Sequence, residues 1–245
     1  MTDNKSIIGI KEASDILGVS LDTLRRWDKN GKLLSERGDA SGYRYYSREK
    51  IDNFLKNQNI FNLAKKWVFT KKGATPIDVF YCQNSYVFQG RLSKLEFELS
   101  KIPGWELNFS ILSSIAGEIG NNSFDHNLGN WPDVPGIFFA YDMEKRIIVL
   151  ADRGRGVLKT LKAIKPELED DAEALKVAFT EIISGRAPES RGNGLKFVRR
   201  AIEKNPISLL FQSGEAVLKM KMMNADLNIE KSKKIFHGCL IAIKF

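Results

Sequence analysis

Residues 109–127, FSILSSIAGEIGNNSFDHN, hold the pattern that decides how this chain folds and what it binds. A largely apolar run leads into GEIGNNSFDHN, which carries two carboxylates, three asparagines and one of only two histidines in the chain. At roughly 100° per residue, a helix places four of these polar residues on one side: Glu118, Asn122, Asp125 and His126. An asparagine there can offer its side-chain oxygen to Mg²⁺, and a glutamate one turn earlier can take a proton from water or a hydroxyl.

A second segment, VLADRGRGV (149–157), predicts a strand followed by a glycine-rich turn. The strand ends at Asp152, where a carboxylate can accept a hydrogen bond from an exocyclic amine. Gly154 and Gly156 lack a Cβ, so the backbone can pass close to a flat ligand.

A third segment, SRGNGLKFVRR (190–200), predicts a helix that opens at Gly192 and Gly194. Exposed N–H groups and the positive end of the helix dipole make such a start favourable for phosphate. The roughly thirty residues before it end in SGRAPES and indicate a mobile lid. Each segment alone is most often structural, but all three in this order and spacing are not expected by chance.

Together the three segments resemble the Bergerat-fold (GHKL) ATPases, the group that includes gyrase, the heat-shock chaperone of that fold, histidine kinases and MutL. The resemblance covers about residues 105–245: EIGNNSFDH is similar to the N box, DRGRG to the first glycine box and RGNGL to the second. It implies a cavity for ATP and Mg²⁺ that the polar side of the helix faces, with Glu118 as general base, Glu118 and Asn122 at the metal, and Asp152 on the adenine amine. The nucleotide-binding residues that it implies are Asn122, Asp125, His126, Asp152, Gly154, Gly156, Gly192, Gly194 and Leu195.

Some residues depart from the patterns within that group. Gly238-Cys239 stands where a Gly-Thr pair often helps to bind adenine. The chain shows no dimerising hairpin with a phosphoacceptor histidine, so we do not expect a histidine autokinase. The spacing of Glu118, Asn122 and His126 is similar to that of the anti-sigma serine kinases, whereas Asn-Ser-x-Asp is similar to the gyrase and chaperone subgroup. The expected activity is a weak ATPase or a protein serine/threonine kinase; alternatively, Glu118 only orders water near the metal.

The first sixty residues carry a different pattern. IGIKEASDILGVSLDTLRRWDKNGKL (8–33) predicts two helices joined by a tight turn at Gly18, with Ser20 as the cap of the second. The residues expected to face inward are Ile10, Ala13, Ile16, Leu17, Leu21, Leu24 and Trp27. Residues 37–46 predict a short β-wing with at least one tyrosine in its core, and Ser47 caps a helix that continues through Lys56.

This region resembles the winged-helix DNA-binding domain of the MerR and excisionase families over nearly all of residues 7–56, through GVSLDTLRRWDKNGKL and SGYRYYS. The resemblance implies a module that docks on double-stranded DNA. The residues expected to meet DNA are Arg25, Arg26, Lys29, Arg37 and Arg44. MerR-type regulators usually continue into a long dimerisation helix, which this chain does not show, so only DNA docking carries over.

Composition sets further limits. The chain has 245 residues with 43% hydrophobic and 28% charged content, ordinary for one large domain or two unequal ones. The net charge of +8 is compatible with a polyanionic partner but is spread along the chain. No apolar run has membrane-spanning length, no signal peptide is recognisable, and Cys82 and Cys239 are expected to be buried free thiols. We therefore expect a cytoplasmic protein without a membrane partner.

These observations predict an α+β chain with two domains: a winged helix-turn-helix domain at residues 1–60, and a Bergerat-type α/β sandwich at 61–245 with helices on one face of a mixed sheet. Three functions remain open. The first is a DNA-binding regulator that nucleotide binding or hydrolysis switches; the second is an anti-sigma-type protein serine kinase or partner-switch protein tethered to DNA; the third is a non-catalytic ATP-binding interaction protein. A homodimer is expected, because winged-helix readers commonly meet two half-sites. The DNA sequence, the partner protein and the biological process are not defined.

Overall fold

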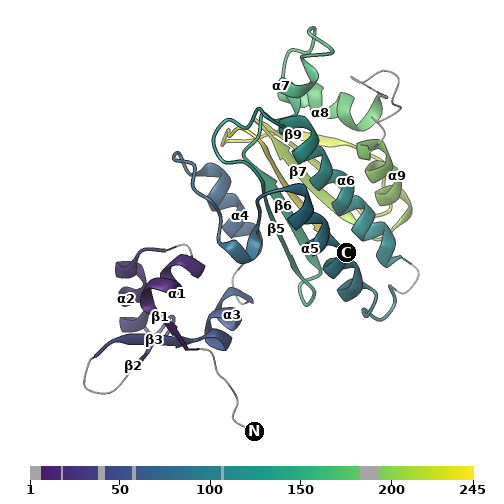
Figure 1. Cartoon of the computed structure of the whole chain (residues 1–245). Coiled ribbons are helices and arrows are strands. Elements are labelled where there is room, and N and C mark those ends of the chain that lie inside the picture. The colour runs from purple at the N-terminus through teal and green to yellow at the C-terminus, as the bar shows by residue number, and fades with distance from the viewer. Residues whose placement is uncertain (1–6, 18, 38–41, 57–58, 106–107, 183–193) are drawn as a thin grey trace. The chain divides into compact units, whose positions relative to one another are not determined.

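The structure, a computed structural model, describes residues 7–17, 19–37, 42–56, 59–105, 108–182 and 194–245. The chain folds into two compact units (Figure 1). The first comprises residues 1–59 and 75–80, and the second comprises residues 60–74 and 81–245. The segment 60–74 therefore belongs to the second unit, although both of its neighbours in sequence belong to the first.

The first unit combines helices with a three-stranded antiparallel sheet. Its helices are α1 (Ile10–Leu17), α2 (Leu21–Lys29), α3 (Arg48–Lys56) and the 3₁₀ turn η1 (Asp78–Phe80). Its strands pair in the order β1 (Ile7–Gly9), β3 (Arg44–Ser47), β2 (Glu36–Arg37). The helix-turn-helix and wing predicted from the sequence are present, while the turn residue Gly18 and the wing tip at 38–41 lie outside the described residues.

Local contacts explain why this unit forms. Ser20 Oγ accepts a hydrogen bond from the Thr23 N–H at 3.2 Å and so caps α2, as predicted. Leu24 and Tyr46 are fully buried in the core, so one tyrosine of the wing does pack inside. Leu21 was expected to face inward but is 36% exposed, because it begins α2 at the edge of the core.

The second unit is built on a seven-stranded sheet with the order β4-β5-β6-β10-β7-β8-β9. The strands are β4 (Tyr81–Cys82), β5 (Ile137–Asp142), β6 (Ile147–Asp152), β7 (Ser208–Ser213), β8 (Ala216–Met220), β9 (Asn228–Lys231) and β10 (Cys239–Lys244). We expected a mixed sheet, but neighbouring strands are antiparallel throughout the described sheet. Short hairpins join β5 to β6 and β7 to β8, and β10 lies between β6 and β7 in the opposite direction to both.

Helices cover both faces of this sheet rather than one. On one face lie α5 (Ser85–Leu99), α6 (Phe109–Asn127), α8 (Asp171–Thr180) and α9 (Gly194–Lys204); on the other lies α4 (Ile60–Phe69) (Figure 1). Phe138 of β5 meets Trp67 of α4, whereas its neighbour Phe139 meets Phe88 of α5. The two rings point in opposite directions because successive side chains of a strand alternate. The predicted α+β class is confirmed, with α4 as an additional layer.

Two expectations from composition can be compared with the structure. Among the described residues, no helix is both long and apolar enough to cross a membrane. Cys82 and Cys239 are free thiols, with Cys82 buried and Cys239 partly exposed.

Candidate functional site

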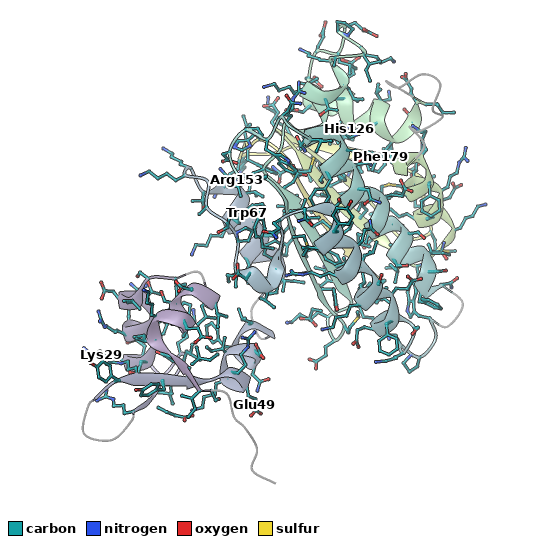
Figure 2. All side chains as sticks on the ribbon, in the orientation of Figure 1. Lys29, Glu49, Trp67, His126, Arg153 and Phe179 are labelled. Carbon is teal, nitrogen blue, oxygen red and sulfur yellow. The ribbon has the colours of Figure 1, made fainter. Side chains whose placement is uncertain are left out.

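A cavity of about 90 Å³ lies at the C-terminal half of α6, next to the end of β6. Five of the predicted site residues line it: Asn122, His126, Asp152, Gly156 and Leu195. The remaining lining residues are Ile119, Ser123, Asn127, Val157, Thr160, Leu161, Ala178, Phe211, Cys239 and Ile241. Figure 2 shows His126 on α6. The three sequence segments therefore meet at one cavity, whose walls are mostly apolar with a few polar groups among them.

Asp152 is the most deeply placed charged group of this cavity, with 1% of its surface exposed. Its Oδ1 accepts a hydrogen bond from the Gly154 N–H at 2.8 Å, and its Oδ2 accepts one from the Ser123 hydroxyl at 2.8 Å. Burial raises the pKa of the Asp152 carboxyl, although the hydrogen bonds from Gly154 and Ser123 oppose the shift. Asp152 is thus a preoriented hydrogen-bond acceptor at the cavity wall.

Asn127 supports the glycine-rich turn through hydrogen bonds of its side-chain amide. Its Oδ1 accepts a hydrogen bond from the Arg155 N–H at 2.8 Å, and its Nδ2 donates to the Ser123 carbonyl at 2.8 Å. A Cβ at Gly154 would collide with the Asn127 amide, so glycine allows this close approach. Sequence reasoning missed Asn127 as a site residue, and its signal was only its place at the end of the polar stretch, one turn after Ser123.

Gly156 and Gly238 shape the other side of the turn. Both have left-handed backbone angles, with φ of +76° and +97°, which favour glycine. Ser213 Oγ accepts a hydrogen bond from the Val157 N–H at 2.9 Å and donates to the Gly238 carbonyl at 3.2 Å. Val157 begins the short helix α7 (Val157–Leu161), so Ser213, which sequence reasoning also missed, anchors α7 to the sheet.

Cys239 lines the cavity beside Asp152, at the place where the sequence departs from a Gly-Thr pair. Burial raises the pKa of its thiol well above the ordinary value, and the charge of Asp152 acts in the same direction. Cys239 therefore remains a neutral thiol and can offer a ligand only a weak S–H donor.

The remaining predicted residues of this region are not among those that line the cavity. A Cβ at Gly194 would collide with Oε2 of Glu118 and would lie 3.6 Å from Nδ2 of Asn122, so these two side chains meet the start of α9. Glu118 is exposed and is not part of the cavity lining. Asp125 is exposed and does not line the cavity either, and Gly192 lies outside the described residues.

The first unit presents its own candidate surface. Arg25, Arg26 and Lys29 are exposed on α2, and Arg37 is exposed on β2. Arg25 Nη1 contacts the Asp22 carboxylate at 2.7 Å in an exposed ion pair, which is weak in water.

Arg44, also expected at DNA, makes an internal contact. Its Nε donates to Asp28 Oδ2 at 2.8 Å, while Asp28 Oδ1 accepts from the Ser35 N–H at 2.9 Å. Burial tends to raise the pKa of Asp28, but these hydrogen bonds outweigh it and the pKa is lowered. Arg44 therefore ties the wing to α2.

Fold and site define an α+β protein in which a helix-turn-helix unit accompanies a second unit with a mostly apolar cavity that holds a few polar groups. Residues 9–46 match the family model described as MerR family regulatory protein, which confirms the predicted MerR-like region. A stretch of 57 residues, 23% of this chain, is 49% identical to the type II methyltransferase M.Eco47II of Escherichia coli, of which it spans only 14%.

One solved structure is similar to a larger part of this chain. The ATPase region of Saccharomyces cerevisiae topoisomerase II is similar over 55% of this chain and 37% of its own length, at 17% identity and a TM-score of 0.38.

Proposed function

We propose that this chain binds ATP·Mg²⁺ in the cavity of the second unit and double-stranded DNA through the first unit, and that the nucleotide switches the affinity for DNA. The observation that carries the proposal is the convergence of Asn122, Asp152 and Leu195 on one cavity from three separate segments. These are the segments that resemble the N box and the two glycine boxes of Bergerat-fold ATPases.

The cavity suits a purine with an exocyclic amine. Apolar side chains such as Ile119, Leu161 and Ile241 form walls for a flat ring. Asp152 presents a carboxylate that burial and two hydrogen bonds hold in place, so an amine of the ring can donate to it. Adenine satisfies both requirements.

The start of α9 suits the phosphates. Gly194 begins a helix of 11 residues, and the unpaired N–H groups of such a start attract anions. The Glu118 carboxylate and the Asn122 amide both reach this point. With the amide turned so that its oxygen faces the site, the two side chains would form a donor set that Mg²⁺ accepts together with water and phosphate oxygens. When bound there, Mg²⁺ would neutralise charge on the phosphates.

DNA binding is supported by the match of residues 9–46 to the MerR family model and by the exposed cations of α2. Arg26 and Lys29 would contact phosphates or base edges, whereas Arg44 supports the wing through Asp28. Two copies of the chain would bind two half-sites, as winged-helix readers commonly do.

One observation favours a catalytic variant of this function. Glu118 of α6 is exposed at the point where its side chain meets the start of α9, and it does not line the cavity. Water or a serine hydroxyl of a partner protein can therefore reach it. The proposal therefore includes slow hydrolysis of ATP, with phosphoryl transfer to a partner serine as the alternative.

The switch is tested by measuring DNA affinity with and without ATP·Mg²⁺ over a series of salt concentrations. We expect nucleotide to change the dissociation constant by about 5-fold or more, the lower end of the usual range of coupling between sites. Equal affinities at every salt concentration would refute the switch, whereas binding of ATP would be tested separately by calorimetry.

A further inference from the structure

Arg153 follows Asp152 in the glycine-rich turn but has its contacts on the other side of the sheet. Its side chain is only 2% exposed. Nε donates to both carboxylate oxygens of Asp133, at 3.1 and 2.9 Å, and Nη2 donates to Oδ2 at 2.5 Å. A buried guanidinium with such a paired carboxylate is a stiff contact, because breaking it leaves an uncompensated charge.

The third nitrogen of this guanidinium holds the end of α4. Nη1 donates to the carbonyl oxygens of Trp67, Val68 and Thr70 at 2.9, 3.0 and 2.9 Å, and Figure 2 shows Arg153 beside Trp67. The last carbonyls of a helix lack partners within the helix and carry its negative dipole end. Arg153 supplies both the donors and the charge that this helix end needs.

The rest of the segment 60–74 is tied to the same place. The Trp67 Nε1–H donates to the Ala74 carbonyl at 2.6 Å, which brings the end of the segment back against α4. A Cβ at Gly73 would lie 2.8 Å from Oδ2 of Asp133, so the backbone of the segment also packs on Asp133. Arg153 and Asp133 therefore hold the segment from α4 to residue 74.

The segment 60–74 belongs to the second unit, but the chain before it and the chain after it belong to the first unit. Residue 59 before it and residue 75 after it both belong to the DNA-binding unit. Covalent connections at residues 59–60 and 74–75 therefore link the segment that contains α4 to the first unit, and a third connection at residues 80–81 links β4 to it.

We propose that Arg153 and Asp133 transmit the state of the nucleotide cavity to the segment 60–74 and so set the DNA affinity of the first unit. The inference rests on the proposed function, because it names the route by which the switch acts. Asp152 contacts the ligand, and its neighbour Arg153 contacts α4. The turn that contains Asp152 and Arg153 is constrained by the hydrogen bond from the Gly154 N–H to Asp152 and by the Asn127 amide, which packs against Gly154. A ligand that displaces Asp152 therefore also displaces the Arg153 guanidinium, which donates to the carbonyl oxygens at the end of α4.

The test measures coupling in the full-length chain. The dissociation constant of ATP·Mg²⁺ is determined by calorimetry with and without a saturating DNA duplex, and the ratio of the two constants is compared between variants. Asp133→Asn keeps the shape of the side chain and removes the charge that holds Arg153. The matched control is Asp142→Asn, at the opposite end of the β5–β6 hairpin, where Asp142 pairs with Lys145 at 2.6 Å.

We expect a ratio of about 5 or more in the wild type and in Asp142→Asn, and a ratio below about 2 in Asp133→Asn. A wild-type ratio retained in folded Asp133→Asn would overturn the route through Arg153 and leave the switch intact. A ratio of one already in the wild type would refute the switch itself, and this inference with it.

A second measurement needs no variant and covers the case in which Asp133→Asn does not fold. Amide hydrogen exchange of the wild type is followed before and after addition of ATP·Mg²⁺. Residues 60–74 do not line the cavity, so slower exchange of Trp67 to Thr70 reports transmission rather than contact. Unchanged exchange in this segment, with protection at Asp152 to Val157, would overturn the proposal.

Discussion

Asp152→Asn separates the role of Asp152 as a ligand acceptor from any role in folding. In the folded protein the Gly154 N–H needs an acceptor at Oδ1, so the amide oxygen of asparagine takes that place. The amide N–H₂ group then occupies the position of Oδ2, where the Ser123 hydroxyl can turn to accept from it. A ligand amine would meet a donor in place of an acceptor.

The expected loss of binding follows from this geometry. A hydrogen bond to a charged acceptor contributes about 1.5–3 kcal/mol, and the opposed donors add to the loss. A change of about 3 kcal/mol corresponds to about 100-fold in the dissociation constant for ATP. Inosine triphosphate carries a carbonyl in place of the amine, so Asp152→Asn should bind it better than the wild type does.

Asp152→Asn should affect the stability of the fold much less than it affects the binding of ATP. Burial raises the pKa of Asp152, so its charged form is less favourable in the folded chain than in water, and neutral asparagine removes that cost. We expect the melting temperature to fall by no more than about 4 °C, the equivalent of about 1 kcal/mol in a protein of this size. Calorimetric titration with both nucleotides, beside thermal unfolding, tests both statements. A folded Asp152→Asn that binds ATP as tightly as the wild type would refute the assignment of the adenine site.

Three further changes test other parts of the structure. Arg26→Ala should weaken DNA binding for all sequences and reduce the slope of log affinity against log salt by about 0.9, as measured by fluorescence anisotropy over a salt series; an unchanged slope would remove Arg26 from the interface. Gly238→Ala should abolish nucleotide binding and lower the melting temperature, because φ is +97° and the new Cβ would collide with the Asp152 carbonyl; calorimetry that finds wild-type affinity would contradict this packing. The lowered pKa of Asp28 contributes stability in full above its unfolded value near 3.8, and this is lost as the pH falls through the lower folded-state value. Urea unfolding should therefore show a smaller loss between pH 5 and about pH 3 for Asp28→Asn than for the wild type, and equal losses would exclude the contribution.

Periodicity and motifs predicted the elements that carry local signals. The helix that ends at Asn127, the strand that ends at Asp152 and the cap at Ser20 depend on neighbouring residues, and all three are present. The sequence did not predict that all neighbouring strands are antiparallel, because an apolar strand has the same residue pattern whichever way it runs in the sheet. Arg153 appeared only as part of a glycine box, because its partners Asp133 and Trp67 are 20 and 86 residues away. Contacts of that range have no signal in a local pattern.

The central position of β10 has a consequence for synthesis. β6 and β7 do not pair with each other, and each pairs with β10 instead. During translation one edge of β6 and one edge of β7 therefore remain unpaired until Cys239–Lys244 leaves the ribosome. Unpaired strand edges of that kind are prone to aggregate. The cavity, whose wall includes Ile241, is complete only after this last strand is inserted.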